Sequence, residues 1–363
     1  MRTKIQQASR PSFFSEPNPS TQLLFTHPKC LERQANSSAQ PKVLVMAARG
    51  RESLTKIQNA LLQSQAEVHY QRILNPMSQA QFVEAARDFD YLAITRRAIH
   101  RLGADTLNAL PRLKGISVYS TGTEWIDSDF MRLRGIQLSA LPDYCTNAVA
   151  ETALGLLLLS AHRLHLRYLK TTRVIPDYVS LRGRELRHGT VGILGYGRIG
   201  KLLAQKIQPL CKQVFVHDCN PKKVTFVPPE ISPLGKKTLL SRADWIVCCA
   251  SQDFEEKAIL TDTDYALLRP ETTLINVART SLLDHGRLIQ MVQNQQLGGY
   301  FYDDILQPEE KPDEVEFGKI VPVGHTAWYT NEAMEAGTND WLENLYKLIS
   351  TYSSKQNVQI SIC

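Results

Sequence analysis

The chain has 363 residues, of which 43% are hydrophobic and 21% are charged, values ordinary for a globular protein long enough to form two domains. No apolar run approaches the roughly 20 residues of a membrane span, and no basic stripe is interleaved with aromatic residues. Neither a membrane nor a nucleic acid is therefore a predicted partner. The formal net charge is +6, and half of it lies in residues 1–40, where five basic side chains outnumber two acidic ones.

The first 40 residues are rich in Ser, Gln and Pro and lack apolar periodicity, so we expect residues 1–40 to be a disordered tail. The tail is poor in acidic residues, which makes an organelle transit peptide the alternative to the cytoplasmic location that we predict. The seven cysteines include no CxxC pair, and Cys248 and Cys249 adjoin within an apolar run. Buried free thiols in a reducing compartment are expected, with no disulfide framework and no structural metal.

From residue 42 the sequence alternates short apolar runs with helical patterns, which is typical of parallel strands joined by crossover helices. Helical patterns occur, for example, at 53–63 and 79–89. The first series of runs predicts strands at 43–46, 68–70, 91–94, 116–119 and 136–139. Together these segments predict one small α/β domain.

A long helix is predicted from Asn147 to Arg163. Leucines surround its centre, and a helix that is apolar on nearly all faces must be buried, here between two domains or two subunits. The helical pattern at 328–349 has no new sheet to join, so we expect it to pack back near the first domain. Between these two helices, a second series of strands is predicted at 191–194, 214–217, 245–249, 274–277, 299–302 and 320–323.

The strand at 191–194 runs directly into Gly-Tyr-Gly-Arg-Ile-Gly, a GxGxxG motif between a strand and a helix. The first glycine permits a tight turn, the second lets the backbone approach a pyrophosphate, and the third lets the helix pack closely on the strand. The helix N-terminus then offers free N–H groups to the phosphates. The cofactor-binding residues predicted from this motif are Gly195, Gly197, Arg198, Ile199 and Gly200.

Asp218 ends the next predicted strand, 23 residues after Gly195. A carboxylate at this spacing accepts a hydrogen bond from the ribose 2′-OH and repels a 2′-phosphate, so NAD is favoured over NADP. Lys222 and Lys223 lie nearby and would weaken that preference. The alternative is a set of turn glycines with an ordinary surface aspartate.

Reduction of a 2-keto acid needs a cation that holds the carboxylate and a proton donor for the developing alkoxide. Arg279 follows the strand at 274–277 and has the forked geometry that grips a carboxylate. His325 follows the strand at 320–323, and histidine is the usual general acid near neutrality. Taken singly, a salt-bridged Arg279 and a structural His325 are the alternatives.

Four segments together resemble the D-isomer-specific 2-hydroxyacid dehydrogenase family. They read STGTEWID, LPDYCTNAVAETALGLLLL, INVART and GHTAWYTNEA, and begin at residues 120, 141, 275 and 324. The resemblance extends from about residue 42 to residue 350. The wording of DYCTNAVAE and HTAWYT is most similar to the subgroup that includes the C-terminal-binding-protein corepressors.

The resemblance implies an α/β fold with two doubly wound parallel-sheet domains. A Rossmann NAD-binding domain (145–325) is inserted into a flavodoxin-like substrate domain (41–144 and 326–363). The implied cofactor is NAD, the implied substrate is a small D-2-hydroxy or 2-keto acid, and homodimers are usual.

The resemblance also implies roles for individual residues. Arg279 would hold the substrate carboxylate and carbonyl oxygen, and His325 would shuttle the proton. Arg96 is an additional candidate for a second acidic group of the substrate, with a surface charge as the alternative. Further cofactor contacts are expected at Ala278, Arg279 and Asp303. Substrate contacts are expected at Arg96, Thr121, Gly122, Thr123 and Trp328.

The sequence departs from the family pattern at three places. The glutamate that supports the catalytic histidine falls on Pro308, and a shift of one residue places Gln307 or Glu309 there. Thr280 stands where the family usually has Gly, and Gly324 where it usually has Pro. The altered glutamate segment leaves two other functions open: a regulatory dinucleotide-binding protein with little catalysis, and a formate dehydrogenase-like enzyme, which also carries Gln-Pro.

Overall fold

The two series of apolar runs form two parallel sheets. The computed structural model describes residues 40–251, 257–305 and 317–360, with the backbone alone from residue 352. The tail predicted to be disordered lies outside these residues, except for Gln40. Within the described part of the chain, no helix has the length and apolar character needed to cross a membrane.

The first sheet has the strand order β2-β1-β3-β4-β5, with every pair parallel. This is the doubly wound order of flavodoxin, so the predicted flavodoxin-like architecture is confirmed. Its strands are β1 (Lys42–Ala47), β2 (Glu67–Arg72), β3 (Tyr91–Thr95), β4 (Gly115–Tyr119) and β5 (Gln137–Ser139). The helices between them are α1 (Lys56–Gln65), α2 (Gln79–Ala86), α3 (Ala104–Asn108) and α4 (Ser128–Leu133).

The second sheet has the order β12-β11-β10-β9-β6-β7-β8 and is also parallel. The chain leaves β6 toward β7 on one side and returns to β9 on the other, which makes the carboxyl end of β6 the switch point of the sheet. Its strands are β6 (Thr190–Leu194), β7 (Gln213–His217), β8 (Ile231–Pro233), β9 (Trp245–Cys248), β10 (Thr273–Asn276), β11 (Gly299–Tyr302) and β12 (Ile320–Pro322). Its helices include α6 (Leu164–Thr171), α7 (Arg198–Ile207), α8 (Lys236–Arg242), α9 (Asp262–Tyr265) and α10 (His285–Gln293).

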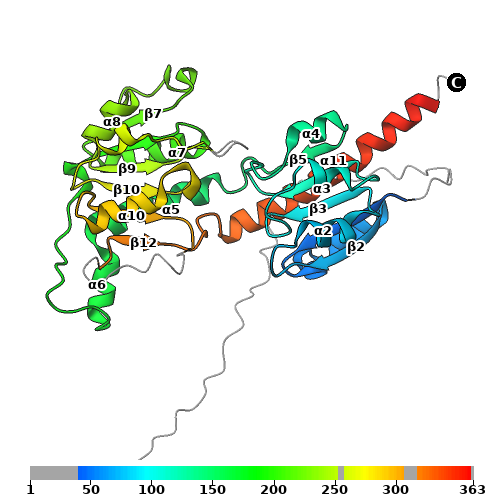
Figure 1. The fold of residues 1–363 in the computed structure, drawn as a ribbon, viewed down its shortest axis with the longest axis horizontal. Helices are drawn as coiled ribbons and strands as arrows, with labels where there is room; N and C mark the ends of the chain where they lie inside the picture. Colours follow the sequence, from blue (N-terminus) through cyan, green and yellow to red (C-terminus); the bar gives the residue numbers. More distant parts are fainter. Residues whose placement is uncertain (1–39, 252–256, 306–316, 361–363) are drawn as a thin grey trace, which may run out of the picture. The chain divides into compact units, whose positions relative to one another are not determined.

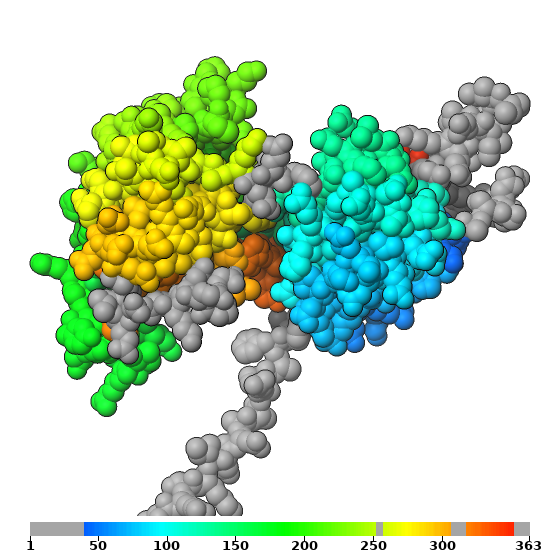
Figure 2. Space-filling view, viewed as in Figure 1, coloured from blue at the N-terminus to red at the C-terminus, as the bar shows by residue number. Residues whose placement is uncertain are grey.

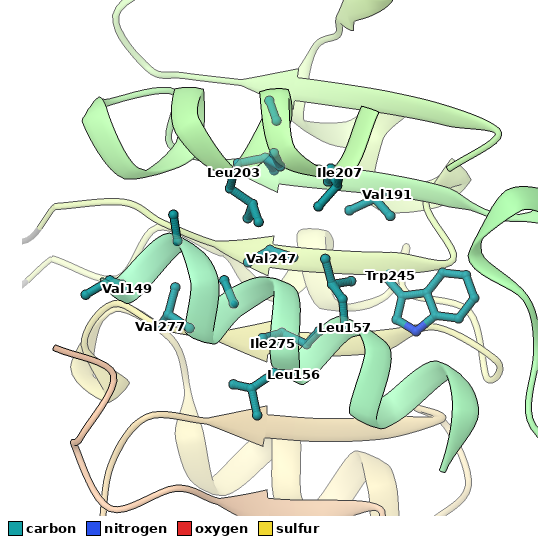
Figure 3. Packing of buried hydrophobic residues seen from close by; sticks show 14 of the residues in the cluster. Val149, Leu156, Leu157, Val191, Leu203, Ile207, Trp245, Val247, Ile275 and Val277 are labelled. Atoms are coloured by element: carbon teal, nitrogen blue, oxygen red, sulfur yellow. The ribbon is translucent and has the colours of Figure 1, made fainter. Parts of the chain in front are cut away.

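Helix α5 (Thr146–His162) is the long apolar helix expected from the sequence. Figure 3 shows Leu156 and Leu157 of this helix facing the sheet beside Ile275 and Val247, within one buried cluster. The helix therefore buries one side against the second sheet, and its predicted burial between two domains or two subunits remains a prediction. Its other leucines, at 154, 158 and 159, are only partly buried. The helix ends at His162, and the next residue, Arg163, has a left-handed φ of 51°.

The C-terminal helix α11 (Asn331–Ile360) returns to the first sheet, as expected (Figure 1). Trp341 is 2% exposed, its indole N–H donates to the carbonyl of Ser117 at 2.9 Å, and the Ser117 hydroxyl donates to the Trp341 carbonyl at 2.9 Å. These bonds join α11 to β4 and complete one core of the first sheet. The domain boundaries 41–144, 145–325 and 326–363 remain a proposal.

We expect Trp341→Ala to lower the free energy of unfolding by about 3–5 kcal/mol, because it leaves a large cavity and removes a buried hydrogen bond. Chemical denaturation followed by far-UV circular dichroism measures the change. Lys347→Ala is the control on the same helix, since its side chain is 67% exposed; a surface change of this kind alters stability by less than about 0.5 kcal/mol. Equal effects of the two substitutions would contradict the role of Trp341.

Candidate functional site

The glycine-rich loop connects β6 to α7 at the switch point of the second sheet. Gly195 has a φ of 95°, and a Cβ there would lie 2.6 Å from the backbone nitrogen of Ala250. A Cβ at Gly200 would lie 2.0 Å from the carbonyl oxygen of Gly195, so the helix can approach the strand only with glycine there. A Cβ at Gly197 would meet nothing within 4 Å. The loop therefore has an open approach to its backbone at the place where a pyrophosphate is expected.

Asp218 follows β7 and is 8% exposed. Its carboxylate accepts hydrogen bonds from the backbone N–H groups of Tyr196 and Asn220, both at 2.9 Å, and lies 3.4 Å from the Lys223 ammonium. Burial alone would raise the pKa of the Asp218 carboxyl. The two backbone donors and Lys223 stabilise the charged form more strongly, so this pKa lies below its ordinary value. The structure thus places a charged carboxylate against the glycine-rich loop.

Two further residues of this motif have contacts of their own. Arg198 begins α7 and pairs with Asp143 at 3.0 Å, with both side chains at least half exposed. Ile199 packs against the core of the second sheet. Neither contact tests their predicted roles toward a cofactor.

Arg279 lies just beyond β10, where the side chain of Asn276 shapes the turn. The Asn276 amide donates to the Arg279 carbonyl at 3.1 Å and accepts from the Ala278 N–H at 3.0 Å. The guanidinium of Arg279 is 36% exposed and pairs through Nε with Oε1 of Glu124 at 3.0 Å. Arg279 is therefore salt-bridged to an acid from the loop after β4, and its role toward a substrate remains a prediction.

His325 lies in the loop after β12, two strands from β10 in the sheet. Gly324 and His325 have φ values of 81° and 57°, so both adopt the left-handed conformation, and the His325 residue is exposed. Proline cannot adopt a positive φ. The glycine at 324, which departs from the family pattern, therefore permits a turn that the usual residue would forbid.

Asp303 holds this loop from the end of β11. Its buried carboxylate accepts from the backbone N–H groups of Thr326 at 2.7 Å and Ala327 at 3.1 Å. Burial raises the pKa of the Asp303 carboxyl above its ordinary value, although the charge of His325 and these two donors act in the opposite direction. Asp303 thus fixes the backbone of the loop that carries His325. Gln307 and Glu309, the predicted partners of His325, lie outside the described residues.

A cavity of about 190 Å³ adjoins Arg279. This is room for a small molecule, since a cavity of about 150 Å³ accommodates benzene. Arg96 lies in its wall, stacks at 5.0 Å on the ring of Trp125, and donates to the carbonyls of Ile99 and His100. The residues that line the cavity are Arg96, His100, Arg101, Glu124, Trp125, Arg279, Thr280, Ser281 and Asp304.

The loop from Ser120 to Thr123 is fixed by its own side chains. The Ser120 hydroxyl and the Trp125 indole N–H both donate to the Gly122 carbonyl, at 2.8 and 3.1 Å. The Thr121 hydroxyl donates to the Leu141 carbonyl at 3.0 Å, and the Thr123 carbonyl accepts from Ile126. The loop therefore presents a rigid backbone beside Arg279.

Trp328 packs in an aromatic cluster with Tyr119 and Tyr144, whose ring centroids each lie 6.3 Å away. Its expected contact with the substrate remains a prediction.

The described cysteines at 145, 211, 219, 248 and 249 are free. Cys248 is buried, which raises its pKa to about 11, whereas Cys249 is partly exposed.

Of the residues that line the cavity, the sequence had indicated Arg96 and Arg279 as site residues, and Glu124 and Asp304 are among those that it missed. Asp304 accepts from the Thr280 hydroxyl at 2.8 Å and so joins the turns after β10 and β11. The threonine in place of the family glycine was the only signal for this bond. Glu124 directly follows Thr123, an expected substrate contact, but nothing in the sequence indicated that it would lie beside Arg279.

The comparisons with known proteins agree with this geometry. A family model described as the NAD binding domain of D-isomer specific 2-hydroxyacid dehydrogenases matches residues 154–327. The glycerate dehydrogenase of Methylorubrum extorquens is 26% identical over 266 residues, which cover 70% of this chain and 81% of that protein. The glyoxylate reductase of Thermofilum pendens is 26% identical over 271 residues, which cover 72% and 78% of the two chains.

The solved D-lactate dehydrogenase of Aquifex aeolicus, in complex with NAD and lactic acid, matches with a TM-score of 0.70 and 20% identity. The match covers 85% of this chain and 96% of that chain. At this identity the likeness supports the fold: two parallel α/β sheets, one of them of Rossmann type.

The fold and the family model define an NAD-dependent oxidoreductase. Residues 154–327 match the NAD binding domain of the D-isomer-specific 2-hydroxyacid dehydrogenase family, and the predictions of this family and of NAD are confirmed. The related dehydrogenases and reductases favour catalysis on hydroxyacids over the regulatory and formate alternatives. The narrower likeness to the corepressor subgroup remains a prediction.

We expect Asp218→Asn to lower the melting temperature near pH 7. The difference in melting temperature from the wild type should shrink progressively as the pH falls to about 3. The pKa of this carboxyl is lower in the folded chain than in the unfolded one, so its charge stabilises the fold above the unfolded pKa. That contribution is lost as the pH falls through the folded pKa. Thermal denaturation across this pH range measures the difference from the wild type.

Asp129→Asn is the control for charge removal, because the Asp129 side chain is 85% exposed. A difference between wild type and Asp218→Asn that stays constant over the whole range would contradict the charged state assigned to Asp218.

Proposed function

We propose that this protein transfers hydride between NAD and a small D-2-hydroxy or 2-keto acid, with Arg279 and His325 as its catalytic residues. The observation that carries the proposal is the pairing of Arg279 with a carboxylate at the wall of a cavity of about 190 Å³. A guanidinium that already binds one carboxylate in this place has the geometry to bind that of a substrate.

The residues of the second sheet fit NAD. The approach to Gly197 is open, the N-terminus of α7 directs N–H groups toward it, and Asp218 offers a carboxylate to the adenosine ribose. When bound, NAD supplies the hydride donor or acceptor. Asp303 and Ala278, at the carboxyl ends of β11 and β10, would lie along the nicotinamide half of the site.

Residues from the loops of both sheets would orient the substrate and move the proton, although His325 and Trp328 are not among those that line the cavity. Arg279 and the backbone of Thr121, Gly122 and Thr123 bind the carboxylate, which fixes the direction of the carbonyl bond. His325 donates a proton to the carbonyl oxygen during reduction and removes it during oxidation. Asp303 keeps the His325 loop in place through two backbone hydrogen bonds. Trp328 and Arg96 complete the substrate contacts that we propose.

His325→Ala should reduce kcat/KM for a 2-keto acid by about 10²–10⁴-fold, because the developing alkoxide loses its proton donor. Arg279→Lys should also abolish most of the turnover, since an ammonium cannot form the bidentate bond. Oxidation of NADH, followed by absorbance with glyoxylate, hydroxypyruvate, pyruvate and longer analogues, measures both effects, with NADPH in parallel.

Arg134→Lys is the matched control for the arginine change, because Arg134 stands on the surface beside α4 with Asn108 as its hydrogen-bond partner. Full activity of either site variant would remove the role assigned to that residue. No turnover of any acid by the wild type, despite NADH binding, would overturn the proposed function.

We further propose a homodimer that uses α6 and the segment after it. This segment stands out from the second sheet and is drawn in green in Figure 2. It exposes four large apolar side chains, an unusual surface for a monomer. They are Leu164 (47% exposed), Tyr168 (70%), Val174 (65%) and Tyr178 (81%).

The free cysteines of the described residues agree with a reducing compartment, and we place the protein in the cytoplasm on that ground.

The double substitution Tyr168→Glu with Val174→Glu should convert the dimer to a monomer, because two charges would be buried without partners in the interface. Sedimentation velocity measures the change. Phe226→Glu is the control, since Phe226 is 92% exposed and lies outside this segment. A monomeric wild type, or a double variant that remains dimeric, would contradict the proposed interface.

A further inference from the structure

The guanidinium that is proposed to bind the substrate carboxylate is already paired with a carboxylate of the chain itself. Oε1 of Glu124 lies 3.0 Å from Nε of Arg279, and the Glu124 side chain is only 9% exposed. Glu124 belongs to the loop after β4 and Arg279 to the turn after β10. This ion pair therefore joins a loop of the first sheet to a turn of the second sheet.

The other oxygen of Glu124 lies against the backbone of the same loop. A Cβ added at Gly122 would be 2.1 Å from Oε2 of Glu124 and 3.0 Å from Nη2 of Arg279. The carboxylate of Glu124 therefore lies against both the guanidinium and Gly122. These are the two groups that are proposed to hold the carboxylate of a substrate.

Binding of a second carboxylate in this position is electrostatically unfavourable while Glu124 remains there. Two like charges a few ångströms apart repel each other, and the charge of Arg279 is already balanced by one of them. A substrate must therefore displace Glu124 from Arg279, and its apparent affinity falls by the fraction of molecules in which the pair is open.

The surroundings allow this displacement. The backbone at Gly122 is fixed by Ser120 and Trp125, whereas the Glu124 carboxylate lies at the end of a flexible side chain. Arg96 and Arg101 line the same cavity, so a displaced carboxylate would remain in a positively charged environment.

We propose that Glu124 is an internal competitor of the substrate: it pairs with Arg279 in the free enzyme and is displaced by the substrate carboxylate. Glu124 thereby determines the affinity for acids without taking part in hydride or proton transfer. The inference rests on the proposed function, because it requires Arg279 to bind the substrate carboxylate.

The test is Glu124→Gln, which keeps the size of the side chain and removes its charge. We expect KM for 2-keto acids to fall on the order of 10-fold while kcat changes by less than about 3-fold. The affinity for oxamate, an unreactive monocarboxylate, should rise by a similar factor in calorimetric titrations of the NADH-loaded protein. Asp129→Asn, which removes an 85% exposed charge from α4, should change neither value.

The opposite result would assign Glu124 a different role. A rise in KM together with weaker oxamate binding would make it a positioning residue for Arg279 and overturn the competition. Unchanged KM and unchanged oxamate affinity would also overturn it. Tighter oxamate binding by Glu124→Gln, with no turnover of any acid by either protein, would support the competition and refute the proposed function.

Discussion

Parallel pairing of strands imposes the constraint on which this structure depends. Each parallel strand must be followed by a crossover connection, so the carboxyl ends of all strands in a sheet meet at one edge. In the second sheet that edge gathers the glycine-rich loop after β6, Asp218 after β7, Arg279 after β10 and Asp303 after β11. Residues separated by more than a hundred positions in the sequence thus come to share one surface. The chemistry of the site follows from this arrangement rather than from any single local motif.

The features that depend on local periodicity could be predicted from the sequence. The strands β6, β9 and β10 are buried on both faces, so their apolar runs were continuous and their limits were wrong by at most a residue or two. The glycine-rich loop could also be predicted, because each of its glycines is required by steric contacts within the loop or with its immediate neighbours. Strand β8 was missed, since it has only three residues and ends in a proline, which leaves little pattern to detect.

The features that depend on tertiary contacts could not be predicted in this way. Arg279 was expected at the site, but its pairing with Glu124 joins residues 155 positions apart. The left-handed turn at Gly324 and His325 needs Asp303 to hold the following amides, and no local pattern encodes that bond. The sequence thus predicted most of the residues proposed for the site, whereas it did not predict the ion pairs and hydrogen bonds that these residues form. The segment around Gln307 and Glu309 lies outside the described residues, and its support of His325 remains a prediction.

The bond between Ser117 and Trp341 has a consequence for the order in which the chain folds. These residues are 224 positions apart, and the helix that carries Trp341 covers one face of the first sheet. During synthesis, strands β1 to β5 would be complete before α11, and until then that face would be covered only in part, by residues such as Leu62 of α1. The second sheet, whose elements are contiguous, could fold in the interval. The first sheet would then be completed after the second, and its early strands would expose apolar surface for the longer time.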